Sequence, residues 1–424
     1  MALSLASPEP PSDLTDYVRK SDPSFVWSRG GKIETPGATV YDLKLTSQTW
    51  HDIKWEHGLQ VFVPTGTKPT ATFVLWNQGG SPSPSSALLG VLLAEKMQAP
   101  VVFLYGVPNQ PLFGGKKEDA LIAETFVRYL ETGDGTWPLL FPMVKSVTAA
   151  MDAVQAFAAK EWDGHKVTHF IITGASKRGW TSWLTAATSD PRVKAIAPLV
   201  IDTLNMQQQM PNQVKSFGRF SDMIRDYTDR KLVPVPDTPA AKKLWAMIDP
   251  WVYRDRLKLP KLIINGTNDP YWTLDALNFY WDDLPGEKRL LYVPNAGHGL
   301  NETDTNGHGN RDRAVNTLCA FCRSQVKGES FPKLTWKFAD DQPDMVELPV
   351  QSDATFKTLR FWSANSATRD FRPVRWSATE SKQPTLEVKR PATGFCAFFA
   401  EAEYEKAGLT FYLSTQLRIL EQKK

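Results

Sequence analysis

The sequence predicts an α/β protein whose mainly parallel sheet is followed by a small antiparallel β-sandwich. Between residues 39 and 327, short apolar runs rich in β-branched residues alternate with segments of helical periodicity. This alternation is typical of a parallel sheet covered by helices on both faces. After Lys327 helical periodicity becomes scarce and polar turns separate short strand-like runs, which indicates an antiparallel sandwich.

Apolar patterning places the elements of the α/β region in order. Residues 1–38, rich in Pro, Ser and Asp, are expected to form an arm across the surface. Strands are expected at 39–45, 58–64, 71–76, 100–105, 169–173, 195–201, 261–265 and 290–293. Helices are expected at 85–98, 118–131, 143–157, 180–187, 274–284 and 311–326.

A long insertion interrupts this rhythm. Residues 202–257 mix helical and loop patterns and follow the C-terminal end of a strand, so we expect them to form a helical cap over a pocket. The predicted organisation is therefore an arm at 1–38, an α/β domain at 39–327 that includes this cap, and a β-sandwich at 331–424. The strands expected in the sandwich are 334–338, 345–349, 358–362, 385–389, 394–399 and 409–413.

Composition excludes several classes of partner. The 49 Lys and Arg against 46 Asp and Glu give a net charge of +3 with no basic block, so neither nucleic acid nor an anionic membrane is expected. No apolar run reaches the length of a membrane span. Met1 to Ser7 lack the basic start and apolar length of a signal peptide.

Cys319 and Cys322 fall within one expected helix, where a disulfide bridge is sterically awkward, so free buried thiols are expected.

One turn, G-A-S-K-R-G-W at residues 174–180, is the strongest candidate for chemistry. Ser176 lies where an apolar strand becomes a helix, near the helix N-terminus, with Gly174 two residues before it and Gly179 three after it. The spacing is G-x-S-x-x-G, one residue longer than the usual nucleophile elbow. The turn alone suits a helix-capping serine as well as a nucleophile.

Two further residues make the nucleophile the favoured interpretation. Asp269 and His298 each follow a predicted strand, at the edge of the sheet where Ser176 is also expected. The order Ser, Asp, His is that of the α/β-hydrolase fold. We therefore predict a triad of Ser176, His298 as base and Asp269 as orienting acid. Asp202, just past the strand that follows the elbow helix, is a rival for the acid.

The expected oxyanion hole consists of the backbone N–H of Lys177 and a second amide from Gly79 or Gly80, in the turn N-Q-G-G at 77–80. The remaining histidines show no helical ligand spacing with an acid between them, so no zinc site or other metal site is expected. No cofactor is expected either. The expected ligand is a small-molecule or peptide substrate, and the sequence makes no prediction of oligomeric state.

Several blocks resemble one known family. They are Q-T-W at 48–50, V-P-N-Q-P at 107–111, E-D-A-L at 118–121, G-A-S-K-R-G-W at 174–180, D-P at 249–250 with Y-R-D-R at 253–256, and L-P-G-E-K at 284–288. Together they look like the PhoPQ-activated pathogenicity-related proteins, over nearly the whole chain. The resemblance implies an α/β-hydrolase with the set at Ser176, Asp269 and His298. It also implies export to the periplasm or the outside of the cell, although the missing signal peptide leaves the cytoplasm open.

Three functions compete at this point. The first is a serine hydrolase of esterase type, in which Ser176 attacks a carbonyl and an acyl-enzyme is hydrolysed. The second is a peptidase or amidase with the same triad, for which Glu118 and Asp119 would be the acidic groups that bind an amino terminus. The third is a secreted binding or signalling protein on a hydrolase scaffold. Reaction of Ser176 with a fluorophosphonate would separate the first two from the third.

Overall fold

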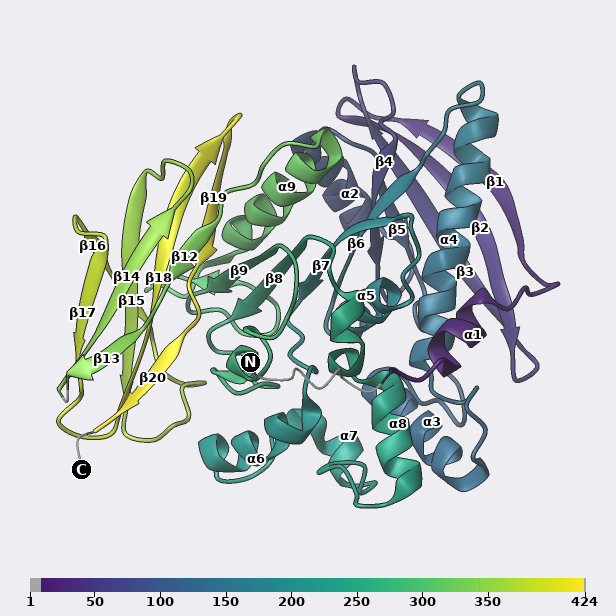
Figure 1. Ribbon diagram of the computed structural model, residues 1–424. Coiled ribbons are helices and arrows are strands. Elements are labelled where there is room, and N and C mark those ends of the chain that lie inside the picture. Colours follow the sequence, from purple (N-terminus) through teal and green to yellow (C-terminus); the bar gives the residue numbers. More distant parts are fainter. Residues whose placement is uncertain (1–8, 343, 423–424) are drawn as a thin grey trace, which may run out of the picture.

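A nine-stranded sheet forms the centre of the molecule, in the order β1-β2-β3-β5-β4-β6-β7-β8-β9 (Figure 1). The computed structural model describes residues 9–342 and 344–422, so the expectation for Met1 to Ser7 lies outside the described residues. All pairs from β5 to β9 are parallel, whereas β1, β2, β3 and β5 pair antiparallel. With its helical cap and C-terminal sandwich, the molecule has the predicted α/β-hydrolase fold class.

The parallel strands are short and apolar because helices cover both of their faces. Every residue of β5 and of β8 is buried, whereas β1 is an exposed edge strand. The strands of the sheet are β1 Val26–Glu34, β2 Ala38–Trp50, β3 Ile53–Pro64, β4 Thr72–Asn77, β5 Val101–Leu104, β6 His169–Ala175, β7 Val193–Leu199, β8 Lys261–Gly266 and β9 Lys288–Val293.

Helices on the two faces of the sheet enclose two separate apolar cores. The helices α2 (Pro84–Met97) and α9 (Asp312–Lys327) pack on one face, and α4 (Leu140–Glu161) and α5 (Lys177–Ala187) on the other (Figure 1). Two more helices extend this side: α1 (Asp13–Arg19) packs on α4, and α3 (Glu118–Thr132) packs against helices of the cap. In the described part of the chain no helix is both long and apolar enough to cross a membrane.

The cap insertion forms a group of short helices beyond the C-terminal ends of the parallel strands (Figure 1). Asp249 holds its two ends together, because its carboxylate accepts hydrogen bonds from the backbone N–H groups of Met206 at 2.9 Å and Trp251 at 2.9 Å. A carboxylate that caps two helix starts in this way satisfies their free donors. The elements are α6 Met206–Phe217, η1 Asp222–Ile224, α7 Arg225–Thr228, α8 Pro239–Ile248 and η2 Pro250–Arg256.

The C-terminal region forms two antiparallel sheets packed as a sandwich beside α9 and β9 (Figure 1). One sheet joins β12, β14, β13 and β17, and the other joins β16, β15, β18, β19 and β20. A two-stranded ribbon, β10 (Glu302–Thr303) with β11 (Gly309–Asn310), precedes α9. The sandwich strands are β12 Leu334–Trp336, β13 Ala339–Gln342, β14 Met345–Ser352, β15 Thr358–Ser366, β16 Ser377–Ser381, β17 Thr385–Lys389, β18 Phe395–Lys406, β19 Leu409–Ser414 and β20 Arg418–Glu421.

The structure differs from the sequence prediction in three places. The segment 1–38, expected as an arm, contains α1 and β1, and β1 adds a strand to the sheet edge. The helix expected at 274–284 is wrong: only η3 (Ala276–Phe279), a single 3-10 turn, forms there. Cap side chains take carbonyls that an α-helix would have used, since Gln209 donates to the Ala276 oxygen and Asn205 to the Phe279 oxygen. The strands β13, β16 and β20 lack the apolar alternation that would have predicted them.

Candidate active site

Ser176 occupies a strained turn between β6 and α5. Its φ of +58° and ψ of −127° lie outside the regions that residues with a Cβ favour. The backbone N–H donates to the Leu199 oxygen at 2.9 Å, and the carbonyl accepts from the Trp180 N–H at 3.0 Å. Ser176 occupies the N-cap position of α5, but its hydroxyl makes no capping bond, so the side chain does not act as a helix cap. The turn instead presents the hydroxyl at the end of the sheet.

The two flanking glycines are explained by close approach of other chain segments. A Cβ on Gly174 would lie 2.7 Å from Asn77 Nδ2 and 2.8 Å from the Arg178 backbone carbonyl carbon. A Cβ on Gly179 would lie 2.6 Å from Ile201 Cγ2. Real Cβ atoms do not tolerate such contacts with backbone or buried groups. The second glycine therefore stands where α5 crosses the end of β7, which is one residue later than in the usual motif.

Asp269 and His298 meet across the turns that follow β8 and β9. His298 Nδ1 lies 2.8 Å from Asp269 Oδ2, and Asp269 Oδ1 accepts from the Tyr271 N–H at 2.8 Å. The Tyr271 ring lies over the imidazole, with centroids 4.2 Å apart. Among the described residues, His298 Nε2 is buried without a hydrogen-bond partner and no hydrogen bond joins it to Ser176. The structure thus brings the expected acid and base into contact and leaves the outer nitrogen of the ring free.

Asp202, the rival acid, faces other partners. Its carboxylate accepts hydrogen bonds from the Tyr280 hydroxyl and from Asn265 Nδ2. Burial raises the pKa of Asp202 to about 7, and the negative charge of Asp269 acts in the same direction, against these two hydrogen bonds. No bond between Asp202 and His298 is found among the described residues.

A partly buried ion pair explains two of the sequence blocks. Arg178 binds both carboxylate oxygens of Glu118, at 2.5 Å and 2.6 Å, and donates from Nε to the Val107 oxygen at 2.6 Å. Gln110 and Glu118 exchange two hydrogen bonds at 2.6 Å and 2.8 Å. Burial raises the pKa of Glu118, but Arg178, with Gln110 and Lys177, outweighs it and lowers the pKa to about 2. Arg178, which follows Lys177 in the elbow turn, therefore links the loop 107–111 to the start of α3.

The acidic pair Glu118 and Asp119 is neutralised by the elbow itself. Lys177 Nζ lies 2.9 Å from Asp119 Oδ2 and 3.2 Å from Glu118 Oε2. The hydroxyl of Tyr227, in the cap helix α7, donates to Asp119 at 3.0 Å. Two carboxylates thus face two cations, which leaves no net negative charge for an amino terminus. Sequence reasoning missed this pairing, because the two blocks are far apart in the chain.

The expected oxyanion donors lie on neighbouring strand ends. Lys177 is the first residue of α5, so its N–H has no partner within the helix. Gly79 and Gly80 follow β4, which pairs directly with β6. The Arg178 guanidinium fills the space that a Gly79 Cβ would need, with Nη2 at 2.2 Å from the Cβ position. Arg178 therefore braces the turn 77–80 against the elbow.

A second serine–histidine pair, His57 with Ser47, lacks the features of a catalytic site. His57 Nε2 lies 2.9 Å from Ser47 Oγ, and Ser47 lies 3.2 Å from Ser146 Oγ. The other ring nitrogen bonds to the Tyr105 oxygen rather than to a carboxylate. Burial lowers the pKa of His57 to about 4. All three side chains are buried, so this chain of hydrogen bonds is structural.

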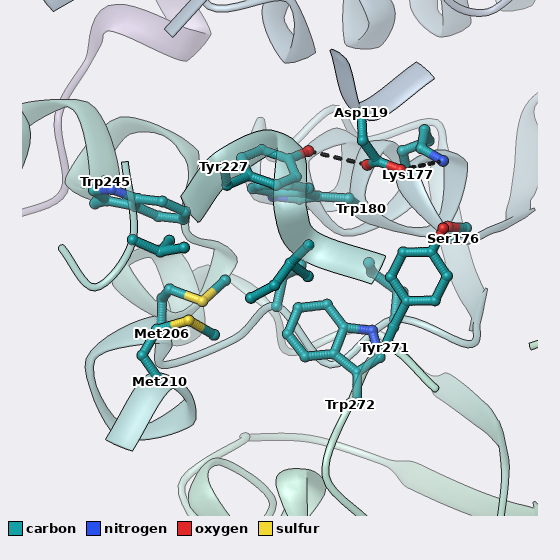
Figure 2. A pocket seen from close by; sticks show the side chains of 14 residues that line it. Asp119, Ser176, Lys177, Trp180, Met206, Met210, Tyr227, Trp245, Tyr271 and Trp272 are labelled. Atoms are coloured by element: carbon teal, nitrogen blue, oxygen red, sulfur yellow. Dashed lines mark hydrogen bonds and ion pairs between the residues drawn. The ribbon is translucent and has the colours of Figure 1, made fainter. Parts of the chain in front are cut away.

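An apolar cavity of about 40 Å³ lies between the elbow and the cap. Figure 2 shows Ser176 at one end of the cavity and Trp245, Met206 and Met210 toward the other. The charged groups at its rim, Asp119 and Lys177, pair with each other. Its main apolar lining consists of Trp180, Ile201, Met206, Met210, Ile224 and Trp245.

The C-terminal sandwich contacts the two turns that carry Asp269 and His298. The side-chain amide of Asn268 donates to the carbonyl oxygens of Arg372 at 3.0 Å and Val374 at 2.7 Å. Asn295 donates from Nδ2 to the Trp376 oxygen at 3.0 Å and accepts from the Trp376 N–H at 2.7 Å. The segment 371–376 therefore holds both turns close to the ends of β8 and β9.

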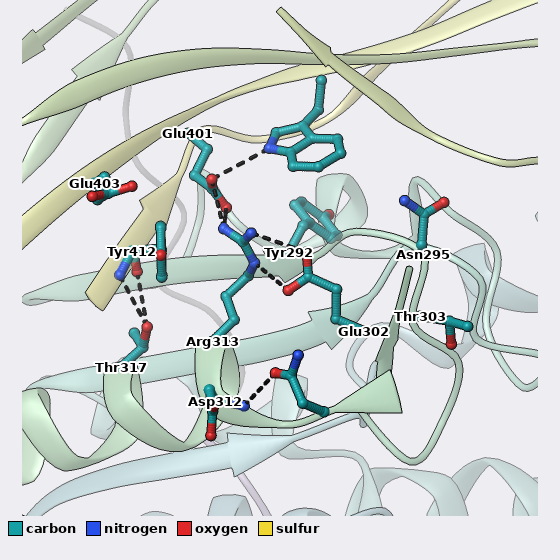
Figure 3. A network of polar contacts seen from close by, with 12 residues as sticks. Tyr292, Asn295, Glu302, Thr303, Asp312, Arg313, Thr317, Glu401, Glu403 and Tyr412 are labelled. Atoms are coloured by element: carbon teal, nitrogen blue, oxygen red, sulfur yellow. Dashed lines mark hydrogen bonds and ion pairs between the residues drawn. The ribbon is translucent and has the colours of Figure 1, made fainter. Parts of the chain in front are cut away.

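A charged network makes a further link on the same side (Figure 3). Arg313 of α9 binds Glu302, four residues after His298, at 2.7 Å and 3.0 Å, and its Nη1 binds Glu401 of β18 at 2.7 Å. Glu401 is fully buried and also accepts from Trp362 Nε1 at 3.3 Å. Burial raises the pKa of Glu401, although Arg313 opposes this effect. The His298 loop is thereby anchored to the sandwich.

Within residues 9–342 and 344–422, no cluster of three His, Cys, Asp or Glu could hold a metal ion.

Comparisons with known proteins agree with the resemblance seen in the sequence. The family model described as PhoPQ-activated pathogenicity-related protein matches residues 14–372. The autocrine proliferation repressor protein A of Dictyostelium discoideum is 31% identical, over 95% of this chain and 88% of that protein.

Solved structures are similar to the chain at low identity. Acetyl xylan esterase 1 from Thermoanaerobacterium sp. JW/SL YS485 is 16% identical with a TM-score of 0.48, covering 69% of this chain and 90% of that one. An S-formylglutathione hydrolase from Agrobacterium tumefaciens is 14% identical with a TM-score of 0.45, covering 71% and 98%.

Proposed function

The chain belongs to the PhoPQ-activated pathogenicity-related protein family, and we propose that it is a serine hydrolase that cleaves carboxylic esters through an acyl-enzyme. The observation that carries the proposal is the hydrogen bond between His298 Nδ1 and Asp269, at 2.8 Å. It fixes the imidazole with its Nε2 unpaired, and the positive-φ Ser176 follows β6 of the same parallel sheet. Nucleophilic catalysis requires an oriented base and a hydroxyl that substrate can reach, and Ser176 lines the cavity beneath the cap.

In the first half of the proposed reaction, Ser176 Oγ attacks the ester carbonyl carbon and gives its proton to His298 Nε2. Asp269 keeps the ring oriented and stabilises the imidazolium. The carbonyl oxygen becomes an oxyanion, held by the N–H of Lys177 and by an N–H of Gly79 or Gly80. The C–O bond to the alcohol then breaks, and the alcohol leaves with the proton from His298.

In the second half, water replaces the alcohol. His298 Nε2 takes one water proton while the hydroxide adds to the acyl carbon, and the oxyanion forms again. The bond to Ser176 then breaks, Ser176 Oγ recovers the proton from His298, and the carboxylic acid departs. One ester bond and one water are consumed for each acid and alcohol formed.

The charge arrangement favours esters over amino-terminal peptides. Glu118 and Asp119 would have to bind the ammonium group of such a peptide, but Lys177 and Arg178 already pair with them. A peptide amine would therefore compete with two fixed cations. We expect p-nitrophenyl esters to be turned over faster than the matching aminoacyl p-nitroanilides.

Labelling with a fluorophosphonate tests the nucleophile directly. We expect one label per chain, on Ser176, and its loss in Ser176→Ala together with ester hydrolysis. Ser189→Ala is a matched control, since Ser189 is an exposed serine that also has a positive φ, at the far end of α5. Labelling that persists in Ser176→Ala, or hydrolysis that persists, would refute the assignment.

A second candidate function is a binding or signalling protein on the same scaffold. The Dictyostelium relative named as an autocrine proliferation repressor motivates this alternative. A chain that folds but is not labelled at Ser176 and cleaves no ester would support it.

We also propose export to the periplasm or cell exterior, from the family resemblance. Cell fractionation with detection of the protein tests this location.

A further inference from the structure

We infer that the cavity behind Ser176 is the acyl-binding site and that it takes short, uncharged acyl groups; this inference rests on the proposed hydrolase function. The cavity begins at Ser176 and ends against the cap (Figure 2). Its apolar lining disfavours a charged group, since a carboxylate or ammonium moved there would lose its hydration. The rim charges Asp119 and Lys177 already bind each other at 2.9 Å.

The size of the cavity limits the chain length. A single water needs roughly 10–15 Å³ of such space, so about 40 Å³ suits an acyl chain of only a few carbons. Met206 and Met210, 4% and 2% exposed, close the far end together with Trp245. Interiors are close-packed, so a longer chain would have to displace these side chains. The two methionines therefore set the length of the acyl group.

A second, larger and more polar space suits the alcohol, so we assign the acyl part to the apolar cavity. A polar groove of about 290 Å³ runs from Gly80, in the proposed oxyanion turn, past Ser81, Asn109 and Lys117. The alcohol must diffuse away after the first step and water must enter, which a large polar groove favours. The acyl group stays covalently bound through both steps and can occupy the smaller apolar cavity.

The test is the chain-length profile of p-nitrophenyl acetate, butyrate, hexanoate and octanoate. For the parent we expect kcat/KM to be highest for acetate or butyrate and to fall at least about tenfold by octanoate, given the cost of misfitting methylenes in an apolar pocket. Met206→Ala and Met210→Ala should each move the maximum toward longer chains. Met223→Ala, an exposed methionine of the same cap (42% exposed), should leave the profile unchanged.

A second series keeps the acyl group as acetate and varies the alcohol from ethyl to octyl. Met206→Ala and Met210→Ala should not change the preference within this series. Any of three results would overturn the acyl assignment. They are a parent maximum at octanoate, methionine variants that keep the parent profile, and methionine variants that change the preference in the alcohol series instead. Because Ser176 labelling and Ser176→Ala are measured in parallel, these results are distinguishable from failure of the hydrolase proposal itself. If no ester is turned over, relative labelling rates with short and long alkyl fluorophosphonates give the same readout.

Discussion

Asn295 and Trp376 exchange two hydrogen bonds, Nδ2 to the Trp376 oxygen at 3.0 Å and the Trp376 N–H to Oδ1 at 2.7 Å. Asn295 lies two residues after β9, in the turn that carries His298, whereas Trp376 directly precedes β16 of the C-terminal sandwich. The reciprocal pair fixes the turn against a separate layer of structure. Asn268 does the same for the turn of Asp269. The C-terminal region thus helps to hold the turns that carry the proposed acid and base.

This arrangement predicts that Asn295→Ala lowers kcat by about 10- to 100-fold with little change in KM, because a small misplacement of a catalytic group is costly. Fluorophosphonate labelling of Ser176 should slow in parallel. Asn278→Ala is the matched control, since Asn278 also bonds to the sandwich, at the Leu417 oxygen, but in η3 away from both turns. Equal effects of the two substitutions on kcat would mean that Asn295 has only a general structural role.

Substitution of Ser176 should separate strain from catalysis. Both Ser176→Ala and Ser176→Gly should lose ester hydrolysis by several orders of magnitude. Glycine adopts the positive φ of this turn without a Cβ penalty, so Ser176→Gly should be more stable than Ser176→Ala by about 1 kcal/mol, after its greater chain entropy is allowed for. Urea unfolding of the two variants measures the difference. A less stable glycine variant would contradict the assignment of strain.

The two acids near the site should differ strongly in their effect on rate. Asp269→Asn removes the carboxylate that bonds His298 Nδ1, and kcat/KM should fall on the order of 10³- to 10⁴-fold. Asp202→Asn should cost less than about tenfold, because its contacts are with Tyr280 and Asn265. Kinetics on p-nitrophenyl acetate compare them. If Asp202→Asn is the more damaging change, the acid of the triad has been misassigned.

The free energy of unfolding at acid pH should depend on the Glu118–Arg178 ion pair. The folded-state pKa of Glu118 is lowered from 4.5 to about 2, so the folded protein binds fewer protons there than the unfolded chain. The stabilisation is therefore complete above pH 4.5 and is lost as pH falls from 4.5 toward 2. Urea unfolding between pH 3 and 6 should show a shallower pH dependence for Glu118→Gln than for the parent. Glu131→Gln, at the exposed end of α3, should behave as the parent does.

Much of the fold was predictable because periodicity records which residues are buried. The alternation of apolar strands and amphipathic helices indicated the parallel sheet, and residue order placed Ser176, Asp269 and His298 at strand ends. The helix expected at 274–284 failed although its apolar spacing suits a helix. There, Gln209 and Asn205 of the cap supply hydrogen bonds that replace those of an α-helix, and no local pattern reveals such competition.

The sequence by itself determined the α/β architecture, the glycines around Ser176 and the family. These depend on short-range properties: side-chain size, turn chemistry and burial pattern. Only the tertiary structure decided that Asp269 and not Asp202 faces His298, that Lys177 and Arg178 neutralise Glu118 and Asp119, and that segment 371–376 holds both turns. Each of these depends on partners more than twenty residues apart, whose meeting is set by how the sheet, cap and sandwich pack together.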